Sequence, residues 1–238
     1  MAKTLLVFGA RNLGRTLAAT LARDGWNTAG VARSEETIAA LRESAPEALG
    51  VVADATSEDD VEAAVARTRE RFGGLDLVVN AMTPRGGGGR TAGSLAESHR
   101  VDLRPYSDEF IPAVFNVLAA ASRALVDEGG GTLVQLTGGS SRRGIPGRGP
   151  WAASAFATRA LVQSAAQELR DRNVHVALLI VDAVIESPKT TTMLDGKPEE
   201  ASASEEDVVR AIRYLDSQSP RGWTHELQLT PRLERWIP

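Results

Sequence analysis

A possible phosphate-binding turn lies near the start of the chain. The stretch Gly9-Ala10-Arg11-Asn12-Leu13-Gly14 follows the apolar run Thr4 to Phe8 and opens a segment of helical period. Glycines between a strand and a helix let the backbone approach a pyrophosphate, which the positive end of the helix attracts. A pair of glycines can also form a tight connection that binds nothing, so dinucleotide binding needs support from the rest of the chain.

The elements that would position this turn alternate along the chain. Short apolar runs alternate with helical segments, which is typical of strand-helix-strand units on a parallel sheet. Leu77 to Val79 and Val176 to Val181 are apolar on both faces, as strands covered by helices on both sides require. Residues 1–238 are therefore predicted to form a single doubly wound α/β domain, with a mainly parallel seven-stranded sheet between helical layers.

The predicted elements can be given by residue. The strands are Thr4 to Phe8, Asn27 to Ala32, Gly50 to Ala53, Leu75 to Asn80, Thr132 to Thr137, Val174 to Val181 and Glu226 to Leu229. The helices are Leu13 to Asp24, Glu35 to Ser44, Glu58 to Phe72, Glu109 to Asp127, Pro150 to Arg170 and Glu205 to Asp216. Loops are expected at 83–89 and at 187–204, and the second of these is the expected substrate loop. Both follow strand ends, at the edge where open α/β sheets bind ligands.

Composition excludes several classes of site and partner. The chain has no cysteine, which rules out disulfides, zinc-thiolate sites and thiol nucleophiles, and no metal site is expected. Its net charge of -4 comes from interspersed charges of both signs, so nucleic acid is not an expected partner. The apolar run after Lys3 is too short for a signal peptide, and no segment is expected to reach the length of a membrane span. The cytoplasm is the expected location.

Several residues, in order, resemble the short-chain dehydrogenase/reductase family over essentially the whole chain. Gly9 and Gly14 match the outer glycines of its TGxxxGxG turn, with one residue deleted and the middle glycine missing. Asp54 matches the carboxylate that usually touches the adenine. The stretch Val79-Asn80-Ala81-Met82 is similar to its NNAG motif, and Asp182 to Pro188 is similar to its PG-x-I-x-T-P segment, without the Pro-Gly. The resemblance implies a Rossmann-type fold and a nicotinamide cofactor.

The resemblance also implies which residues hold the cofactor and which cofactor it is. NAD-selective relatives carry an acidic residue after the second strand, whereas this chain has Ala32-Arg33-Ser34. Arg33 and Arg11 could pair with a 2′-phosphate, so NADP(H) is predicted over NAD(H). The alternative is that Arg33 is a solvated side chain. The predicted cofactor-binding residues are Gly9, Arg11, Asn12, Leu13, Gly14, Arg33, Asp54, Ala55, Asn80, Ala81, Met82, Thr137, Asp182, Ala183 and Ile185.

The catalytic positions depart from the family pattern. The family uses a serine to polarise the substrate, a tyrosine to donate a proton and a lysine to lower the pKa of that tyrosine. Alignment with the family places Gly138, Trp151 and Ala155 at these positions. Indole N–H does not titrate near neutral pH and alanine offers no polar group, so reduction of a ketone by the usual relay is not expected.

Substitute proton donors are scarce. Ser140 lies close enough to Gly138 to replace the serine, and Tyr106 and His99 fall in a region that can face the cleft in this fold. For Tyr106 and His99 a surface or capping role is the alternative. The catalytic residues therefore stay unassigned.

The predicted partners are a small molecule and further copies of the chain. Arg142, Arg143 and Arg148 crowd the loop before Trp151 and could receive an anionic substrate, or they could simply be solvated. The alanine-rich segment from Pro150 to Arg170 would allow close helix packing. In the family this helix and the preceding one form the main subunit contact, which implies a homodimer or homotetramer; the alternative is that the alanines only seat the helix on its own sheet.

Three functions stay open. The first is an atypical NADP(H)-dependent oxidoreductase acting on a carbonyl, enone or imine of a small or polyketide-like molecule. The second is a non-redox cyclase, isomerase or dehydratase on the same scaffold, and the third is a non-catalytic NADP-binding protein. Fold alone does not choose among them.

Overall fold

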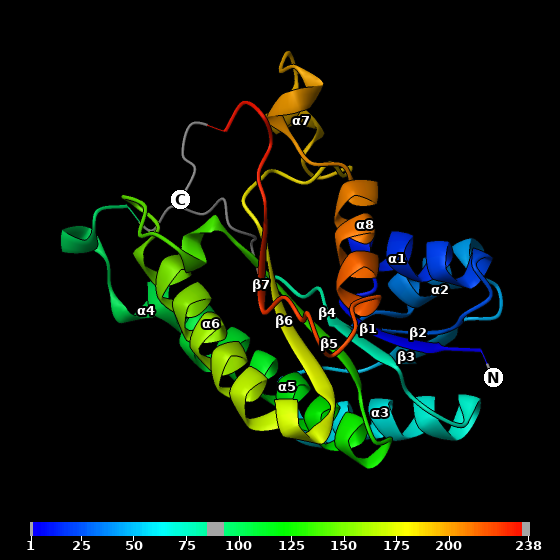
Figure 1. The fold of residues 1–238 in the computed structure, drawn as a ribbon. Helices are drawn as coiled ribbons and strands as arrows, with labels where there is room; N and C mark the ends of the chain where they lie inside the picture. Colours follow the sequence, from blue (N-terminus) through cyan, green and yellow to red (C-terminus); the bar gives the residue numbers. More distant parts are fainter. Residues whose placement is uncertain (1, 85–92, 235–238) are drawn as a thin grey trace.

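The computed structural model describes residues 2–84 and 93–234, which form a three-layer α/β arrangement (Figure 1). Seven strands form one sheet in the order β3-β2-β1-β4-β5-β6-β7, and every neighbouring pair is parallel. The predicted fold class is confirmed. The strands are β1 (Thr4–Phe8), β2 (Asn27–Ala32), β3 (Leu49–Val52), β4 (Leu77–Asn80), β5 (Gly131–Gly138), β6 (Val174–Val181) and β7 (Glu226–Leu229).

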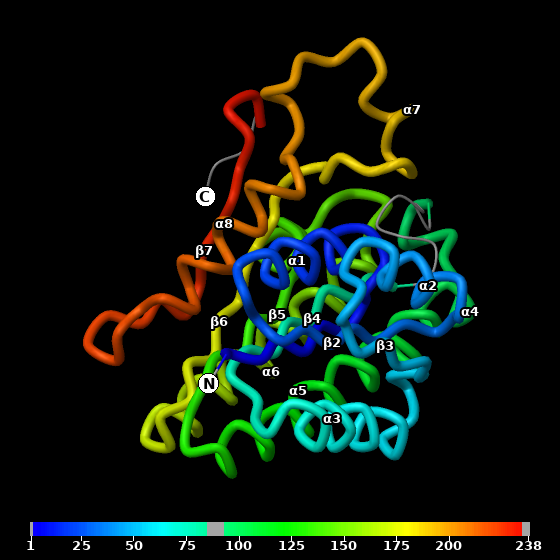
Figure 2. The backbone as a smooth tube through the Cα atoms, turned by 90° about the vertical axis from the view of Figure 1, so that its right-hand side faces the viewer, coloured from blue at the N-terminus to red at the C-terminus, as the bar shows by residue number. Residues whose placement is uncertain are grey.

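Helices cover both faces of the sheet, as Figures 1 and 2 show. One layer holds α1 (Asn12–Arg23), α2 (Glu35–Ser44) and α8 (Glu205–Asp216), and the other holds α3 (Glu58–Phe72), α5 (Ile111–Asp127) and α6 (Gly149–Leu169). Leu17 and Ile212 are buried in the core under the first layer. Val61 and Val117 are buried in the core under the second. All eight residues of β6 are buried, which explains their continuous apolar sequence.

Side chains of the sequence itself fix several element boundaries. The Ser34, Ser57 and Ser204 hydroxyls cap α2, α3 and α8 by accepting backbone N–H groups of the first turn. The strand expected from Leu75 begins two residues later, because the Asp76 carboxylate accepts the Thr4 N–H at 2.7 Å in place of a ladder bond. Apart from the helix predicted from Glu109, no other end of a predicted strand or helix differs by more than one residue.

The helix predicted from Glu109 starts earlier in the structure. Helix α4 (Arg100–Arg104) continues through the π-helical turn η2 (Pro105–Phe110) into α5. Pro105 has no N–H to donate, and the helix widens from an α to a π turn at this residue. The whole run, Arg100–Asp127, is long and apolar enough to cross a membrane by length and composition, which corrects the expectation that no segment would reach that length. A buried core helix passes the same test, and Val114, Val117 and Leu125 are buried against the sheet.

The expected substrate loop at 187–204 is partly helical. It contains α7 (Thr191–Leu194) and the short helix η5 (Glu199–Ala201), and Ala203 pairs with Ile185 in an isolated parallel bridge. Most of the loop expected at 83–89 lies outside the described residues. The remaining short helices are η1 (Leu95–Glu97), η3 (Gly139–Ser141) and η4 (Arg170–Arg172).

Candidate functional site

A cavity of about 540 Å³ opens at the carboxyl ends of the central strands. Its walls come from the turn after β1, the ends of β2 to β6, the start of α6 and the π turn η2. Parallel strands deliver their following loops to this one edge, where doubly wound sheets bind ligands. The predicted site residues on the wall are Gly9, Arg11, Asn12, Leu13, Gly14, Arg33, Asp54, Ala55, Ala81, Met82, Thr137, Gly138, Trp151, Ala155, Ala183 and Ile185.

The glycine turn leaves room for a ligand where a side chain would not fit. Gly9 has φ +89°, and a Cβ there would lie 2.9 Å from the carbonyl carbon of Ala81. A Cβ on Gly14 would lie 2.4 Å from the carbonyl oxygen of Gly9. The N-cap residue of α1, Arg11, makes no side-chain capping hydrogen bond, and the positive end of this helix lies at the cavity wall. The turn therefore has the form of a phosphate cradle.

Positive charge gathers beside this turn. Arg11 and Arg33 both line the cavity, the first from the turn and the second from the end of β2. Slight burial and the nearby charge of Arg11 lower the pKa of Lys189 below its ordinary value. An anionic group bound between these cations would relieve their mutual repulsion.

The end of β3 supplies a carboxylate to the same region. Asp54 lines the cavity, and its Oδ1 accepts the Thr56 N–H at 3.0 Å and the Thr56 hydroxyl at 2.9 Å. Ser34 and Thr37 line the neighbouring wall at the end of β2. Polar groups of this kind suit the hydroxyls and ring nitrogens of a nucleoside.

Asn80 lies behind the wall instead of on it. Its side chain is fully buried, and its Oδ1 accepts the Met82 N–H at 3.2 Å. Its Nδ2 is buried without a hydrogen-bond partner within the described residues. Asn80 therefore shapes the turn that places Ala81 and Met82 on the wall, and its own contact with a cofactor stays a prediction.

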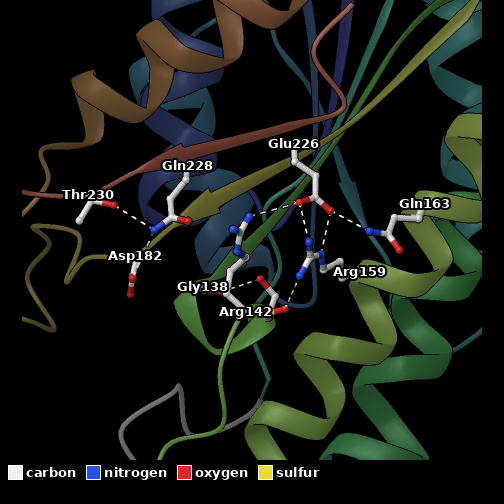
Figure 3. Close-up of polar contacts among 9 residues, drawn as sticks. Gly138, Arg142, Arg159, Gln163, Asp182, Glu226, Gln228 and Thr230 are labelled. Carbon is white, nitrogen blue, oxygen red and sulfur yellow. Dashed lines mark hydrogen bonds and ion pairs between the residues drawn. The ribbon is translucent and has the colours of Figure 1, made fainter. Parts of the chain in front are cut away.

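Asp182 also lies off the wall, because its carboxylate is paired elsewhere. Arg143 donates to both carboxylate oxygens of Asp182, at 2.6 and 3.3 Å. The Gln228 amide approaches one of these oxygens at 3.5 Å (Figure 3). Asp182 is 8% exposed. Its neighbours Ala183 and Ile185 line the cavity, whereas cofactor binding by Asp182 stays a prediction.

A second ion-pair cluster ties the loop after β5 to the edge of the sheet. Glu226 on β7 accepts hydrogen bonds from Arg159 at 2.7 and 2.8 Å, from Gln163 at 2.9 Å and from Arg142 at 3.4 Å (Figure 3). Burial alone would raise the pKa of Glu226, but the hydrogen bonds from Arg159 and Gln163 and the charges of Arg159 and Arg142 lower it below its ordinary value.

These pairs change the interpretation of the arginine-rich loop. Arg142 and Arg143 are held by Glu226 and Asp182, and neither lines the cavity. Arg148 is the N-cap residue of α6 and is also absent from the wall. Within the described residues, none of the three arginines lines this cavity, and their role in receiving an anionic substrate stays a prediction.

The far end of the cavity is built by β5, α6 and η2. Gly138 ends β5, and Trp151, Ser154 and Ala155 lie in the first turns of α6. The Ser154 hydroxyl donates to the Trp151 carbonyl oxygen at 2.8 Å. The Tyr106 ring meets the Trp151 indole edge to face, with centroids 6.2 Å apart and planes at 87°. Trp151 is thus oriented by a buried aromatic neighbour.

The three predicted substitute donors do not line the cavity. Ser140 is 4% exposed within η3, and Tyr106 is buried behind Trp151. His99 begins α4, where its backbone N–H donates to Asp102 at 2.8 Å. A structural role therefore fits each of them better than proton donation.

Sequence reasoning missed several wall residues. Among them are Phe110 and the carboxylates Glu109 and Glu205, together with Ser187. Glu205 accepts a hydrogen bond from the Thr16 hydroxyl, which joins α8 to α1. The available signal for Glu109 was its place at the start of the helix that follows β4, because that edge of the sheet carries the site.

The sequence matches the family described as short chain dehydrogenase over residues 3–195. The chain belongs to the short-chain dehydrogenase family. Enzymes of this family use NAD(P), and its members among the known relatives are oxidoreductases. The glycine turn of this short-chain dehydrogenase occupies the expected place in that fold.

Similar proteins extend the comparison over nearly the whole chain. The 3-oxoacyl-[acyl-carrier-protein] reductase FabG of Staphylococcus aureus is 24% identical over 235 residues, covering 93% of each chain. Among solved structures, ElxO with NADP bound has a TM-score of 0.84 at 18% identity, with 96% of this chain and 97% of that chain covered. An actinorhodin polyketide ketoreductase with NADPH has a TM-score of 0.83 at 22% identity, with 99% and 98% covered. These structural likenesses establish the fold of this short-chain dehydrogenase.

Proposed function

We propose that this short-chain dehydrogenase is an NADP(H)-dependent oxidoreductase with an atypical catalytic end. The observation that carries the proposal is the single cavity that joins the Gly9–Gly14 cradle to Gly138, Trp151 and Ala155. A dinucleotide lying along it would reach from the end of β2 to the start of α6. The family relatives that reduce ketoacyl groups support an oxidoreductase on this scaffold.

The residues present fit a nicotinamide dinucleotide phosphate. Gly9 and Gly14 leave the space that a diphosphate needs, and the uncapped start of α1 favours its charge. Arg33 stands where NAD-selective enzymes carry a carboxylate, so it favours a 2′-phosphate over a free ribose hydroxyl. Arg11 and Lys189 add positive charge nearby. Two solved structures of similar fold contain NADP or NADPH.

The catalytic end does not offer the proton relay of the family. We propose that Gly138, Trp151 and Ala155 replace its serine, tyrosine and lysine. Loss of a general acid costs roughly 10²- to 10⁴-fold in rate for a substrate that needs one. The bound cofactor would supply a hydride. The substrate must therefore either obtain its proton elsewhere or require none.

The same replacement favours a second candidate function. A cyclase, isomerase, dehydratase or non-catalytic NADP-binding protein would keep the cradle and not need the relay. Nucleotide oxidation in the presence of substrate separates these from an oxidoreductase.

The test is a nucleotide titration followed by a substrate panel. NADPH and NADH are titrated against the full chain, and oxidation of the tighter ligand is then followed with carbonyl, enone and imine compounds. We expect NADPH to bind at least tenfold more tightly than NADH, since each charge-assisted contact contributes about 1.5–3 kcal/mol. If NADPH binds but is not oxidised with any compound, the second candidate function is favoured. If neither nucleotide binds, the oxidoreductase and the NADP-binding protein are both refuted.

A further inference from the structure

The substrate end of the cavity, between β5, η2 and α6, offers few side chains that can donate to a bound molecule. The described wall residues include no tyrosine, histidine or lysine. The Ser154 hydroxyl is already engaged, since it donates to the Trp151 carbonyl oxygen at 2.8 Å. The side-chain donors left at this end are the Trp151 indole and the Thr137 hydroxyl, and neither forms a hydrogen bond with another described residue.

The indole N–H of Trp151 is open to the cavity. Trp151 is half-buried and lines the wall. Its ring nitrogen donates to no described residue, yet this atom is not one of the buried polar atoms that lack a partner. Solvent therefore reaches the nitrogen, and the open space that Trp151 borders is the cavity.

Packing holds this donor in one orientation. The ring of Tyr106, which is 7% exposed, meets the indole edge to face, with the two planes at 87°. The π turn η2 that carries Tyr106 packs against α6, which carries Trp151. A donor that is fixed before the substrate binds stabilises developing charge well, because it does not have to reorganise during the reaction.

The chemistry of an indole limits what Trp151 can do for a reaction. Its N–H donates a hydrogen bond but does not give up its proton near neutral pH. Hydride addition to a carbonyl carbon leaves an alkoxide, which is a strong base and needs a proton. An enolate is a much weaker base, because its negative charge is shared between oxygen and carbon. Trp151 therefore suits a reduction whose first product is an enolate.

We propose that the substrate is an α,β-unsaturated ketone, and that the Trp151 indole donates a hydrogen bond to its carbonyl oxygen. The inference rests on the proposed NADP(H)-dependent function and names the substrate class and one catalytic residue for it. Phe110 of η2 and Met82 after β4 give the wall apolar surface, on which an aryl or alkyl substituent of the ketone would pack.

The step balances with water as the proton source. The β-carbon of the substrate accepts a hydride from the reduced nicotinamide. The carbon–carbon π electrons then move to the bond between the α-carbon and the carbonyl carbon, and the carbonyl π electrons move onto the oxygen. This gives an enolate and the oxidised dinucleotide. A water molecule protonates the α-carbon, its hydroxide leaves to solvent, and the product is a saturated ketone.

Binding of an oxyanion can be measured without nucleotide and without turnover. The probe is 4-nitrophenolate, whose charged oxygen resembles that of an enolate, and nitrobenzene is the neutral comparison. Equilibrium dialysis against the full chain should show phenolate binding weakened about tenfold by Trp151→Phe, with a smaller effect on nitrobenzene, because hydrogen bonds to charged groups are the stronger ones. Trp223→Phe is the matched control, since Trp223 stacks on His175 and lies off the wall.

Further variants test whether the N–H itself is responsible. Trp151→Gln keeps an N–H donor and should bind 4-nitrophenolate more tightly than Trp151→Leu, which has a similar size and no donor. A phenolate held at the nucleotide cradle would be lost in Arg33→Ala and kept in Trp151→Phe, and that result would overturn the inference. Loss in Thr137→Val without loss in Trp151→Phe would also overturn it. Circular dichroism checks that each variant is folded.

The kinetic test uses 4-phenylbut-3-en-2-one with NADPH. We expect 4-phenylbutan-2-one to accumulate without any alcohol, because reduction of this saturated ketone would need the missing acid. NADPH deuterated at C4 of the nicotinamide should deliver deuterium to the β-carbon. Removal of a donor to an oxyanion costs about 10²-fold in rate, so Trp151→Phe should lower kcat/KM by about that factor and Trp223→Phe should not.

The outcomes separate this inference from the proposed function. Formation of the allylic alcohol, or oxidation of NADPH with ketones or imines and not with the unsaturated ketone, would overturn the inference and leave the oxidoreductase standing. A larger loss of kcat in Glu109→Gln than in Trp151→Phe would assign the proton to a wall carboxyl group and overturn the role of water. If 4-nitrophenolate binds through Trp151 but NADPH does not bind, the proposed function is refuted and the oxyanion site stands.

Discussion

The Asp182 carboxylate packs against the α-carbon of Gly139. A Cβ on Gly139 would lie 1.9 Å from Oδ1 of Asp182, a separation that no methyl group can adopt. The same carboxylate holds Arg143 at 2.6 Å. Gly139 follows Gly138 of the cavity wall, so Asp182, the first residue after β6, packs behind the loop after β5.

Replacement of Gly139 by alanine should therefore destabilise the fold. The methyl group must displace the Asp182–Arg143 pair, and overpacking of this kind costs about 1–3 kcal/mol. The free energy of unfolding in urea measures the effect. Gly144→Ala is the matched control, since a Cβ there meets no atom within 4 Å. Equal midpoints for the two variants would contradict the close packing of Asp182 on Gly139.

Arg33→Ala should weaken binding of NADPH and leave NADH nearly unchanged. A guanidinium on a 2′-phosphate forms charge-assisted hydrogen bonds, so its loss should raise the NADPH dissociation constant about tenfold or more. Arg67→Ala, on the exposed side of α3, controls for the change in net charge. An unchanged dissociation constant for NADPH would remove Arg33 from the nucleotide site.

His175 should make stability depend on pH. Burial lowers the pKa of His175 below the ordinary value of 6.5, against the opposing effect of its hydrogen bond to the Thr224 carbonyl, and its ring stacks on Trp223 at 5.1 Å. The unfolded chain therefore binds a proton that the folded chain excludes. The contribution of neutral His175 to the free energy of unfolding is fully present above pH 6.5. It is lost as the pH falls below 6.5 towards the lower pKa that His175 has in the folded chain.

The measurement is the free energy of unfolding between about pH 7.5 and pH 5.5, above the range where carboxylates titrate. His175→Asn should flatten the decrease on acidification, although it lowers stability overall. His99→Asn, at an exposed helix start, should leave the slope unchanged. A slope that is identical in wild type and His175→Asn would assign the pH dependence to other groups.

Restoring a relay should restore reduction of a ketone. Trp151→Tyr combined with Ala155→Lys places an acid and a cation on the cavity wall, and we expect reduction of tetralone, a neutral ketone, by NADPH to rise about tenfold or more. Trp151→Tyr with Ala153→Lys is the control, since Ala153 is exposed on α6 and off the wall. No gain over this control would contradict the assignment of these positions.

The fold was predictable because its signals are local. The Val174–Val181 strand was predicted to the residue, since a continuous apolar run has few alternatives in a covered parallel sheet. Helix starts are marked by Ser34, Ser57 and Ser204, because each hydroxyl accepts the backbone N–H three residues further along the chain. The π turn at Pro105 was missed, because a proline inside a helical pattern usually signals a boundary.

The site was predictable only where position in the fold determines it. The Gly9–Gly14 turn and Arg33 lie on the cavity wall, as the strand order requires. The ion pairs of Asp182 and Arg142 could not be predicted, because their partners Arg143 and Glu226 are 39 and 84 residues away along the chain. Pairing over such distances leaves no local pattern. The NADP(H) preference and the oligomeric state stay predictions.

Glu226 has a consequence for how the catalytic end is assembled. It belongs to the seventh strand, yet it binds Arg142 of the loop after β5 and Arg159 of α6 (Figure 3). That loop and that helix carry Gly138 and Trp151 of the cavity wall. The nucleotide cradle is formed by β1, the Gly9–Gly14 turn and α1. The substrate end is complete only after β7 has joined the sheet. In a folding intermediate without β7, the nucleotide cradle would be formed but the substrate end of the cavity would not. Such an intermediate would bind nucleotide before it could select a substrate.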